Sequence, residues 1–100
     1  MVENKFTITA NVWIYSGVGA WHFITLSKKD SDHIRNVFGV LAAGFGSLPV
    51  TVTIGKTTWN TSIFPEKKAG SYLLPLKAKV RKKEKIIAGD TVTLLLEIRV

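Results

Sequence analysis

The stretch of the sequence that decides the fold reads Leu73-Leu74-Pro75-Leu76-Lys77-Ala78-Lys79-Val80-Arg81-Lys82-Lys83. After it come Gly89-Asp90 and the alternating segment Thr91–Val100. This order predicts a short strand, a helix over Lys77–Glu84, a Gly-Asp turn and a last strand. Pro75 is expected at a sheet edge or a strand end, because it cannot donate to the hydrogen-bond ladder.

The first half of the chain repeats this plan. Alternation over Phe6–Ile14 and Ala20–Leu26 predicts two strands, which form a hairpin around the turn residues Ser16–Gly19. A helix follows, and Ser27 is a favourable N-cap for it. Its apolar residues have the i, i+3, i+4, i+7 spacing of one helix face: Ile34, Val37, Phe38 and Leu41.

The middle of the chain supplies the remaining strands. Alternation predicts strands over Val50–Ile54 and Thr57–Ile63, then a polar loop over Phe64–Gly70 and a short strand over Ser71–Leu76. Thr51-Val52-Thr53-Ile54 also matches the start of the last strand, Thr91-Val92-Thr93-Leu94. Two copies of one strand-strand-helix-strand plan predict a small, mainly β barrel with internal two-fold character.

Length and composition favour one folded domain over residues 1–100. The chain is 46% hydrophobic and 21% charged, which is typical of a globular protein. There is no cysteine, so disulfides, thiolate metal sites and a cysteine nucleophile are excluded. The longest mostly apolar run, Val37–Phe45, is too short and too interrupted by glycine to cross a bilayer, and Met1–Lys5 leads into a strand pattern without the apolar core of a signal peptide. We therefore expect a cytoplasmic protein that does not enter the membrane.

Several motifs together resemble a known family. They are Ala20-Trp21-His22-Phe23, Val52-Thr53-Ile54-Gly55, Trp59 with Thr61-Ser62-Ile63-Phe64-Pro65, Tyr72 with Leu74-Pro75, and Val80-Arg81-Lys82 with Gly89-Asp90. They are similar, nearly end to end, to an uncharacterised bacterial family catalogued as domain of unknown function nineteen hundred and five. The resemblance implies a double-split β-barrel capped by short helices. One chain would form it from two β-β-α-β halves, about 1–49 and 50–100.

The resemblance extends more distantly to AbrB-type and MazE-type transcription-factor domains, which build a comparable barrel from two subunits. Leu74-Pro75, Val80-Arg81-Lys82 and Gly89-Asp90 look like their signature of proline, short helix, arginine and Gly-Asp. The family also often accompanies a bacteriocin-protection domain, which this chain lacks. A shared fold implies no activity by itself. Because one chain can close the barrel alone, we expect a monomer.

The basic segment is the first candidate site. With 14 Lys and Arg against 7 Asp and Glu, the formal net charge is +7. Six cations lie within nine residues and would contact phosphates without reading bases: Lys77, Lys79, Arg81, Lys82, Lys83 and Lys85. Candidate partners are a nucleic acid or an acidic protein. The alternative, favoured on sequence alone, is a solvated helix face whose lysines keep the protein soluble.

An aromatic groove is the second candidate site, for a small molecule. Its residues would be Trp59, Thr61, Ser62 and Tyr72. In a barrel of this size, however, large aromatic residues mostly fill the core, and we expect this for at least two of Trp13, Trp21, Trp59 and Tyr72.

No complete catalytic or metal-binding motif is present. His22 and His33 are the only histidines, and two ligands do not make a zinc site. No serine has the spacing of a nucleophile elbow. We therefore expect no catalytic residues, no metal and no cofactor. The sequence favours a non-enzymatic binding or interaction module whose partner is unknown, with nucleic acid or a small molecule as alternatives.

Overall fold

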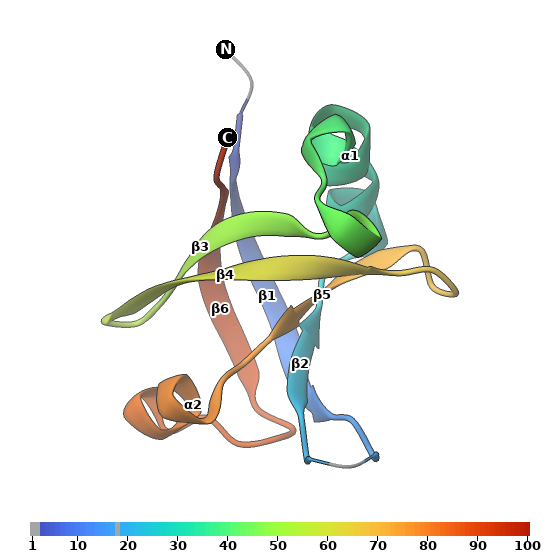
Figure 1. The fold of residues 1–100 in the computed structure, drawn as a ribbon. Coiled ribbons are helices and arrows are strands. Elements are labelled where there is room, and N and C mark those ends of the chain that lie inside the picture. Colours follow the sequence, from blue (N-terminus) through green and yellow to red (C-terminus); the bar gives the residue numbers. More distant parts are fainter. Residues whose placement is uncertain (1–2, 18) are drawn as a thin grey trace.

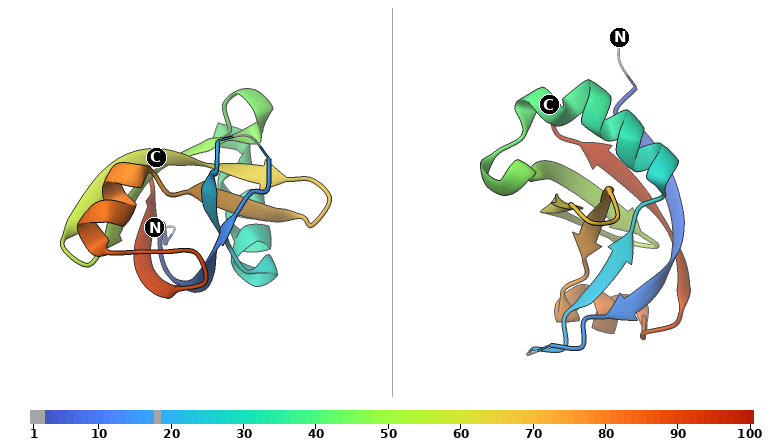
Figure 2. Two further views of the ribbon diagram at one scale, coloured as in Figure 1. Left: turned by 90° about the horizontal axis from the view of Figure 1, so that it is seen from below. Right: turned by 90° about the vertical axis from the view of Figure 1, so that its right-hand side faces the viewer.

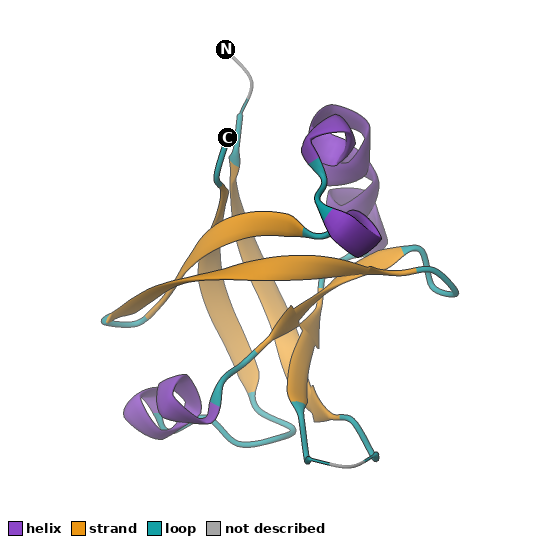
Figure 3. Ribbon diagram, viewed as in Figure 1, coloured by secondary structure: helices purple, strands orange, loops and turns teal. Residues whose placement is uncertain are grey.

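The computed structural model describes residues 3–17 and 19–100, and its strands form a closed antiparallel barrel (Figures 1 and 3). The strands are β1 (Lys5–Ile14), β2 (His22–Thr25), β3 (Leu48–Ile54), β4 (Thr57–Glu66), β5 (Ser71–Pro75) and β6 (Thr91–Ile98). The helices are α1 (Lys28–Phe38) and α2 (Ala78–Glu84). Two 3-10 turns, Gly39–Leu41 and Gly44–Gly46, connect α1 to β3. The mainly β barrel expected from the sequence is confirmed.

The order of strands around the barrel is β1-β2-β5-β4-β3-β6. Exchanging β1, β2 and β3 with β4, β5 and β6 leaves this order unchanged. This two-fold order agrees with a barrel of two β-β-α-β halves, while the double-split detail and the division into residues 1–49 and 50–100 stay predictions. Figure 2 shows that α1 and α2 lie at opposite ends of the barrel.

Every second side chain of the strands points into the barrel and fills its interior. On β3 the residues Leu48, Val50 and Val52 are fully buried, and on β6 so are Leu96 and Ile98. Each large aliphatic side chain removed from water stabilises the fold by about 1.5–3 kcal/mol. The core therefore runs through the centre of the barrel and reaches the helices at both ends.

Two reciprocal hydrogen bonds connect the strands that lead into the helices. The Leu26 N–H donates to the Tyr72 carbonyl, and the Leu76 N–H donates to the His22 carbonyl, both at 2.9 Å. Each helix thus begins directly after a strand that pairs with its counterpart from the other half. Equivalent positions at the two ends of the barrel can therefore be compared residue by residue.

The helix predictions are mostly confirmed. Ser27 caps α1, since its hydroxyl accepts the Asp30 N–H at 3.1 Å. Leu76 and Val80 pack inward as expected, at 3% and 5% exposure. Leu41 is a correction: α1 ends at Phe38, so this residue lies in a 3-10 turn and its side chain is 54% exposed.

Strand boundaries need further corrections. The predicted polar loop over Phe64–Gly70 is wrong in its first half, because Phe64, Pro65 and Glu66 continue β4 and pair with β5. The Glu66 carboxylate accepts the N–H groups of Lys68 and Ala69, which tightens the turn and lets the strand run up to it. β2 begins at His22, not at Ala20. Val18 of the predicted hairpin turn lies outside the described residues. Within the part of the chain that the structure describes, no helix has the length and apolar character needed to cross a membrane.

Candidate functional site

The helix α2 presents the basic segment at one end of the barrel. Val80 and Leu76 hold the helix against the core, while Lys79, Lys82 and Lys83 are exposed. Lys77 precedes the first turn in extended conformation, and Lys85 ends the helix in the left-handed region with φ of 55°. We call the side chains of Lys77, Lys79, Arg81, Lys82, Lys83 and Lys85 the basic face of α2.

The basic face is not neutralised by acidic side chains. Its one acidic neighbour in sequence, Glu84, turns toward β4, where its carboxylate accepts the Thr57 hydroxyl at 2.6 Å. Among residues 3–17 and 19–100, the only ion pairs within 4.0 Å join Asp32 to Lys28 and to Arg35, at the other end of the barrel. Unpaired cations on one helix repel each other in the absence of an anionic partner.

Arg81 is the half-buried member of the basic face. Its Nε donates to the Leu76 carbonyl at 3.2 Å, and its Nη1 lies 3.4 Å from His22 Nε2. His22 Nδ1 is 2.8 Å from the Ala20 carbonyl. A tautomer with its proton on Nδ1 donates to that carbonyl and leaves Nε2 free to accept from Arg81. His22 therefore holds the guanidinium in place at the start of β2.

A groove of about 450 Å³ opens beside Arg81. It lies between the β1–β2 connection, β4, the end of β5 and the start of α2. Its aromatic walls are Trp21 and Phe64, which are 59% and 43% exposed. Its polar groups come from His22, Thr61, Lys77 and Arg81. We call this the larger groove, and it combines exposed rings with unpaired positive charge.

A smaller groove of about 250 Å³ lies between α2 and β4. Its cations are Lys77, Lys79 and Lys83, and Trp59 lines it from the strand. The indole Nε1 of Trp59 is buried and has no hydrogen-bond partner among the described residues. Lys77 lines both grooves, so the basic face separates two hollows.

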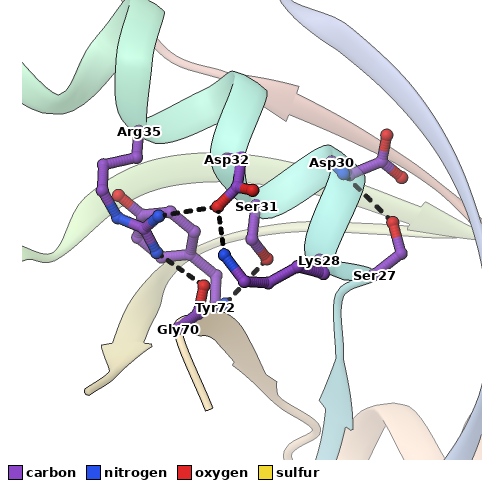
Figure 4. Close-up of polar contacts among 8 residues, drawn as sticks. All are labelled: Ser27, Lys28, Asp30, Ser31, Asp32, Arg35, Gly70 and Tyr72. Carbon is purple, nitrogen blue, oxygen red and sulfur yellow. Dashed lines mark hydrogen bonds and ion pairs between the residues drawn. The ribbon is translucent and has the colours of Figure 1, made fainter. Parts of the chain in front are cut away.

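The opposite end of the barrel is closed by polar contacts (Figure 4). Arg35 donates to Asp32 at 3.0 Å and to the Gly70 carbonyl at 2.7 Å, and its guanidinium carbon lies 5.5 Å from the centre of the Tyr72 ring. Ser31 is fully buried, and its hydroxyl accepts the Tyr72 N–H at 2.9 Å. The arginine at this end is therefore a structural residue.

Charge and burial shift two pKa values at the closed end. The hydrogen bond from Lys28 is the largest cause of the lowered pKa of Asp32. Desolvation opposes it, and the charge of Lys28 and the hydrogen bond and charge of Arg35 lower the pKa further. Burial raises the pKa of Tyr72, and the charge of Arg35 opposes that shift. Both carboxylate and phenol thus keep their usual protonation states at neutral pH.

The predicted small-molecule groove is not brought together as one site. Thr61 lines the larger groove and Trp59 the smaller one. Tyr72 is 3% exposed beneath Arg35, and Ser62 lines neither of these two grooves. Trp59 and Thr61 are two residues apart and share one face of β4, so their different places along the strand assign them to different grooves. Tyr72 belongs to the core, and Trp59 packs against the core. This agrees with the expectation that at least two of Trp13, Trp21, Trp59 and Tyr72 fill the core.

Sequence reasoning missed the groove beside Arg81. Its residues come from three segments, 19–22, 61–64 and 75–81, that only the folded barrel brings together. One signal was present: Gly19 precedes Trp21 in the hairpin connection. Gly19 has φ of +95°, and a Cβ built on it would lie 2.7 Å from Trp21 Nε1. The glycine therefore lets the indole lie close against the backbone.

The comparisons with known proteins place the chain in a family. No curated protein matches it. The family described as Domain of unknown function (DUF1905) matches residues 9–96, which covers both grooves and both helices. The chain therefore belongs to this family, as the motifs in its sequence indicated.

Proposed function

We propose that this domain is a non-enzymatic binding module that binds nucleic acid through the basic face of α2. The observation that carries the proposal is the absence, among the described residues, of any carboxylate within 4.0 Å of these six cations. On the sequence alone, a solvated helix face is the simpler explanation. The half-buried Arg81 and the two hollows beside the helix favour a surface that receives a ligand.

Phosphate contact explains this arrangement physically. Lys79, Lys82 and Lys83 act as exposed point charges, and binding a polyanion releases its condensed counterions. Arg81 can present part of its planar fork to a phosphate while His22 fixes its orientation. The affinity would come mainly from the backbone of the nucleic acid, with little sequence information.

The interface would be one-sided. The α1 end carries Asp30 and Asp32 beside its cations, and Asp32 pairs with both Lys28 and Arg35. The AbrB-type domains build a comparable barrel from two subunits, so a DNA surface there can draw on both halves. Their resemblance supports a nucleic-acid ligand only weakly. The charge distribution supports a single contact surface at α2.

The surroundings of His22 support binding over catalysis. Both ring nitrogens are engaged, one with the Ala20 carbonyl and one with Arg81. A general base must have a nitrogen within reach of the proton that it removes. The arrangement therefore favours His22 as a positioning residue for the arginine.

The test is a salt series of binding to labelled mixed-sequence DNA and RNA. The variant Lys79→Glu/Lys82→Glu/Lys83→Glu should bind at least about 100-fold more weakly at low salt, and its salt dependence should be shallower. The matched control Lys5→Glu/Lys67→Glu/Lys68→Glu changes the net charge equally at exposed positions away from α2. Equal losses in both variants would mean that only net charge matters, and absence of wild-type binding at low salt would contradict the proposal.

A second candidate function is the binding of a small acid in the larger groove. Its volume of about 450 Å³ lies within the usual range of ligand pockets, and Arg81 could pair with a carboxylate there. A thermal-shift screen with small aromatic carboxylates and phosphates tests it. Stabilisation that is lost in Arg81→Met would support it, and no stabilisation by any compound would argue against it.

A further inference from the structure

Exposed aromatic side chains continue from the larger groove over the outer surface of the sheet. The pairing register places Trp13 opposite Phe23, Phe23 opposite Pro75, and Leu73 opposite Phe64. These residues share the face that points away from the core, because their neighbours Ile24 and Leu74 are fully buried. Of these rings, Trp13 is 37% exposed and Phe64 43%. Contiguous exposed apolar faces often mark binding sites.

The rings at the groove are held in fixed positions. The centre of the Trp21 ring lies 6.1 Å from that of Phe23, which in turn lies 5.1 Å from that of Trp13. The Trp13 Nε1 donates to the Thr25 hydroxyl at 2.9 Å, which fixes the end of this row. Trp21 also rests on Gly19. The row therefore presents a preformed aromatic surface whose outermost ring, Trp21, is 59% exposed.

The aromatic surface and the basic face meet at the larger groove. Trp21 and Phe64 line it together with Lys77 and Arg81. Proteins that bind single-stranded nucleic acids combine these two elements, since cations contact the backbone while rings stack on the bases. In a duplex the faces of the bases are covered by their neighbours, so an aromatic ring beside the phosphates has nothing on which to stack.

We infer that the larger groove takes an unstacked base, so that the protein prefers single strands over duplexes. The inference rests on the proposed nucleic-acid binding through α2 and names the form of nucleic acid that this site accepts. The backbone phosphates contact Lys77, Lys79 and Arg81, and the base lies against Trp21 and Phe64. Every base has a flat face, so this contact gives little sequence preference.

The test compares one mixed-sequence oligonucleotide, about 12 nucleotides long to suit a small barrel, as a single strand and as a duplex. Binding is measured at low salt with wild type, Trp21→Ala and Phe64→Ala. Phe45→Ala is the matched control, because Phe45 is 98% exposed and lines neither groove. Melting temperatures establish that each variant is folded, and Phe64→Ala carries the test if Trp21→Ala unfolds. Trp21→Phe, which keeps a ring, is measured as a further control.

We expect wild type to bind the single strand more tightly than the duplex. Trp21→Ala should lower single-strand affinity about tenfold and change duplex affinity by less than about twofold, with a similar but smaller effect of Phe64→Ala. Trp21→Phe should stay near wild type, and Phe45→Ala should have no effect. Equal binding of both forms, or equal losses for both forms in Trp21→Ala, would overturn the inference and leave the proposed function standing. Absence of binding to either form would contradict the proposed function itself.

Discussion

The two ends of the barrel share one frame but differ in the contacts that close it. At each end a strand leads into a helix, and the N–H just before that helix donates to a carbonyl of the partner strand. An arginine on the helix reaches back to the residue that carries this carbonyl. At the α1 end this arginine is Arg35, which contacts Tyr72. At the α2 end it is Arg81, which contacts His22.

The difference lies in what neutralises and covers each arginine. Arg35 has a carboxylate, Asp32, one turn earlier, and a buried serine beside it ties the helix to β5. At the corresponding places before Arg81 stand Ala78 and Lys77, which offer no negative charge. A groove remains there in place of the closing contacts. A few polar side chains therefore distinguish an end that is closed by contacts from an end that keeps a groove.

Removing the buried hydroxyl at the closed end is expected to have the largest effect. Ser31→Ala should lower the free energy of unfolding by about 2 kcal/mol, because the Tyr72 N–H loses its acceptor inside the protein. The counterpart Lys77→Ala should lower it by less than about 0.5 kcal/mol, since Lys77 is exposed. Urea denaturation measures both, and equal losses would mean that the closed end is not held by this serine.

The two arginines should separate stability from binding. Arg35→Met should destabilise the fold by about 1.5 kcal/mol, since it loses a charged hydrogen bond to Gly70 and the contact with the Tyr72 ring. Arg81→Met should cost less stability and weaken nucleic-acid binding. Denaturation and binding are measured on both variants, and a binding loss in Arg35→Met with no loss in Arg81→Met would reverse the assignment of the two ends.

A carboxylate introduced beside Arg81 would make the α2 end resemble the α1 end. Ala78→Asp places a carboxylate at the same i, i+3 spacing from Arg81 that Asp32 has from Arg35. It should weaken nucleic-acid binding about tenfold, about 1.4 kcal/mol, and stabilise the helix by a few tenths of a kcal/mol. Ala78→Asn is the uncharged control. An unchanged affinity in Ala78→Asp would show that Arg81 takes no part in binding.

The smallest expected effect is the pH dependence of the closed end. The pKa of Asp32 is lowered from its ordinary value of 3.8, so its contribution to stability is present above that value and is lost as the pH falls below it. The variant Asp32→Asn should therefore lose less stability than wild type in this acidic window. Thermal unfolding as a function of pH measures the difference, and parallel curves would contradict the assigned role of Asp32.

The sequence was sufficient for features that depend on neighbours along the chain. Strand alternation, the Ser27 cap and the inward side of α2 at Val80 follow from local periodicity. It was insufficient where distant segments meet. The Ser31 hydroxyl pairs with Tyr72, and Arg81 lies beside His22, yet each pair is far apart in sequence. The strand β4 was predicted too short because the turn that follows it is stabilised by Glu66, a contact that alternation does not reveal.

The most direct test of the account is an NMR titration of the wild-type protein with a short single-stranded oligonucleotide. The three tryptophan indole N–H groups report on three places: Trp21 in the larger groove, Trp59 in the smaller one, and Trp13 bonded to Thr25. We expect the largest shift for Trp21, a smaller one for Trp59, and shifts of α2 amides without changes around Arg35. Shifts centred on α1, or no shift of the α2 amides, would contradict the assignment of the α2 end as the binding site, whereas an unshifted Trp21 indole would contradict only the inferred base contact in the larger groove.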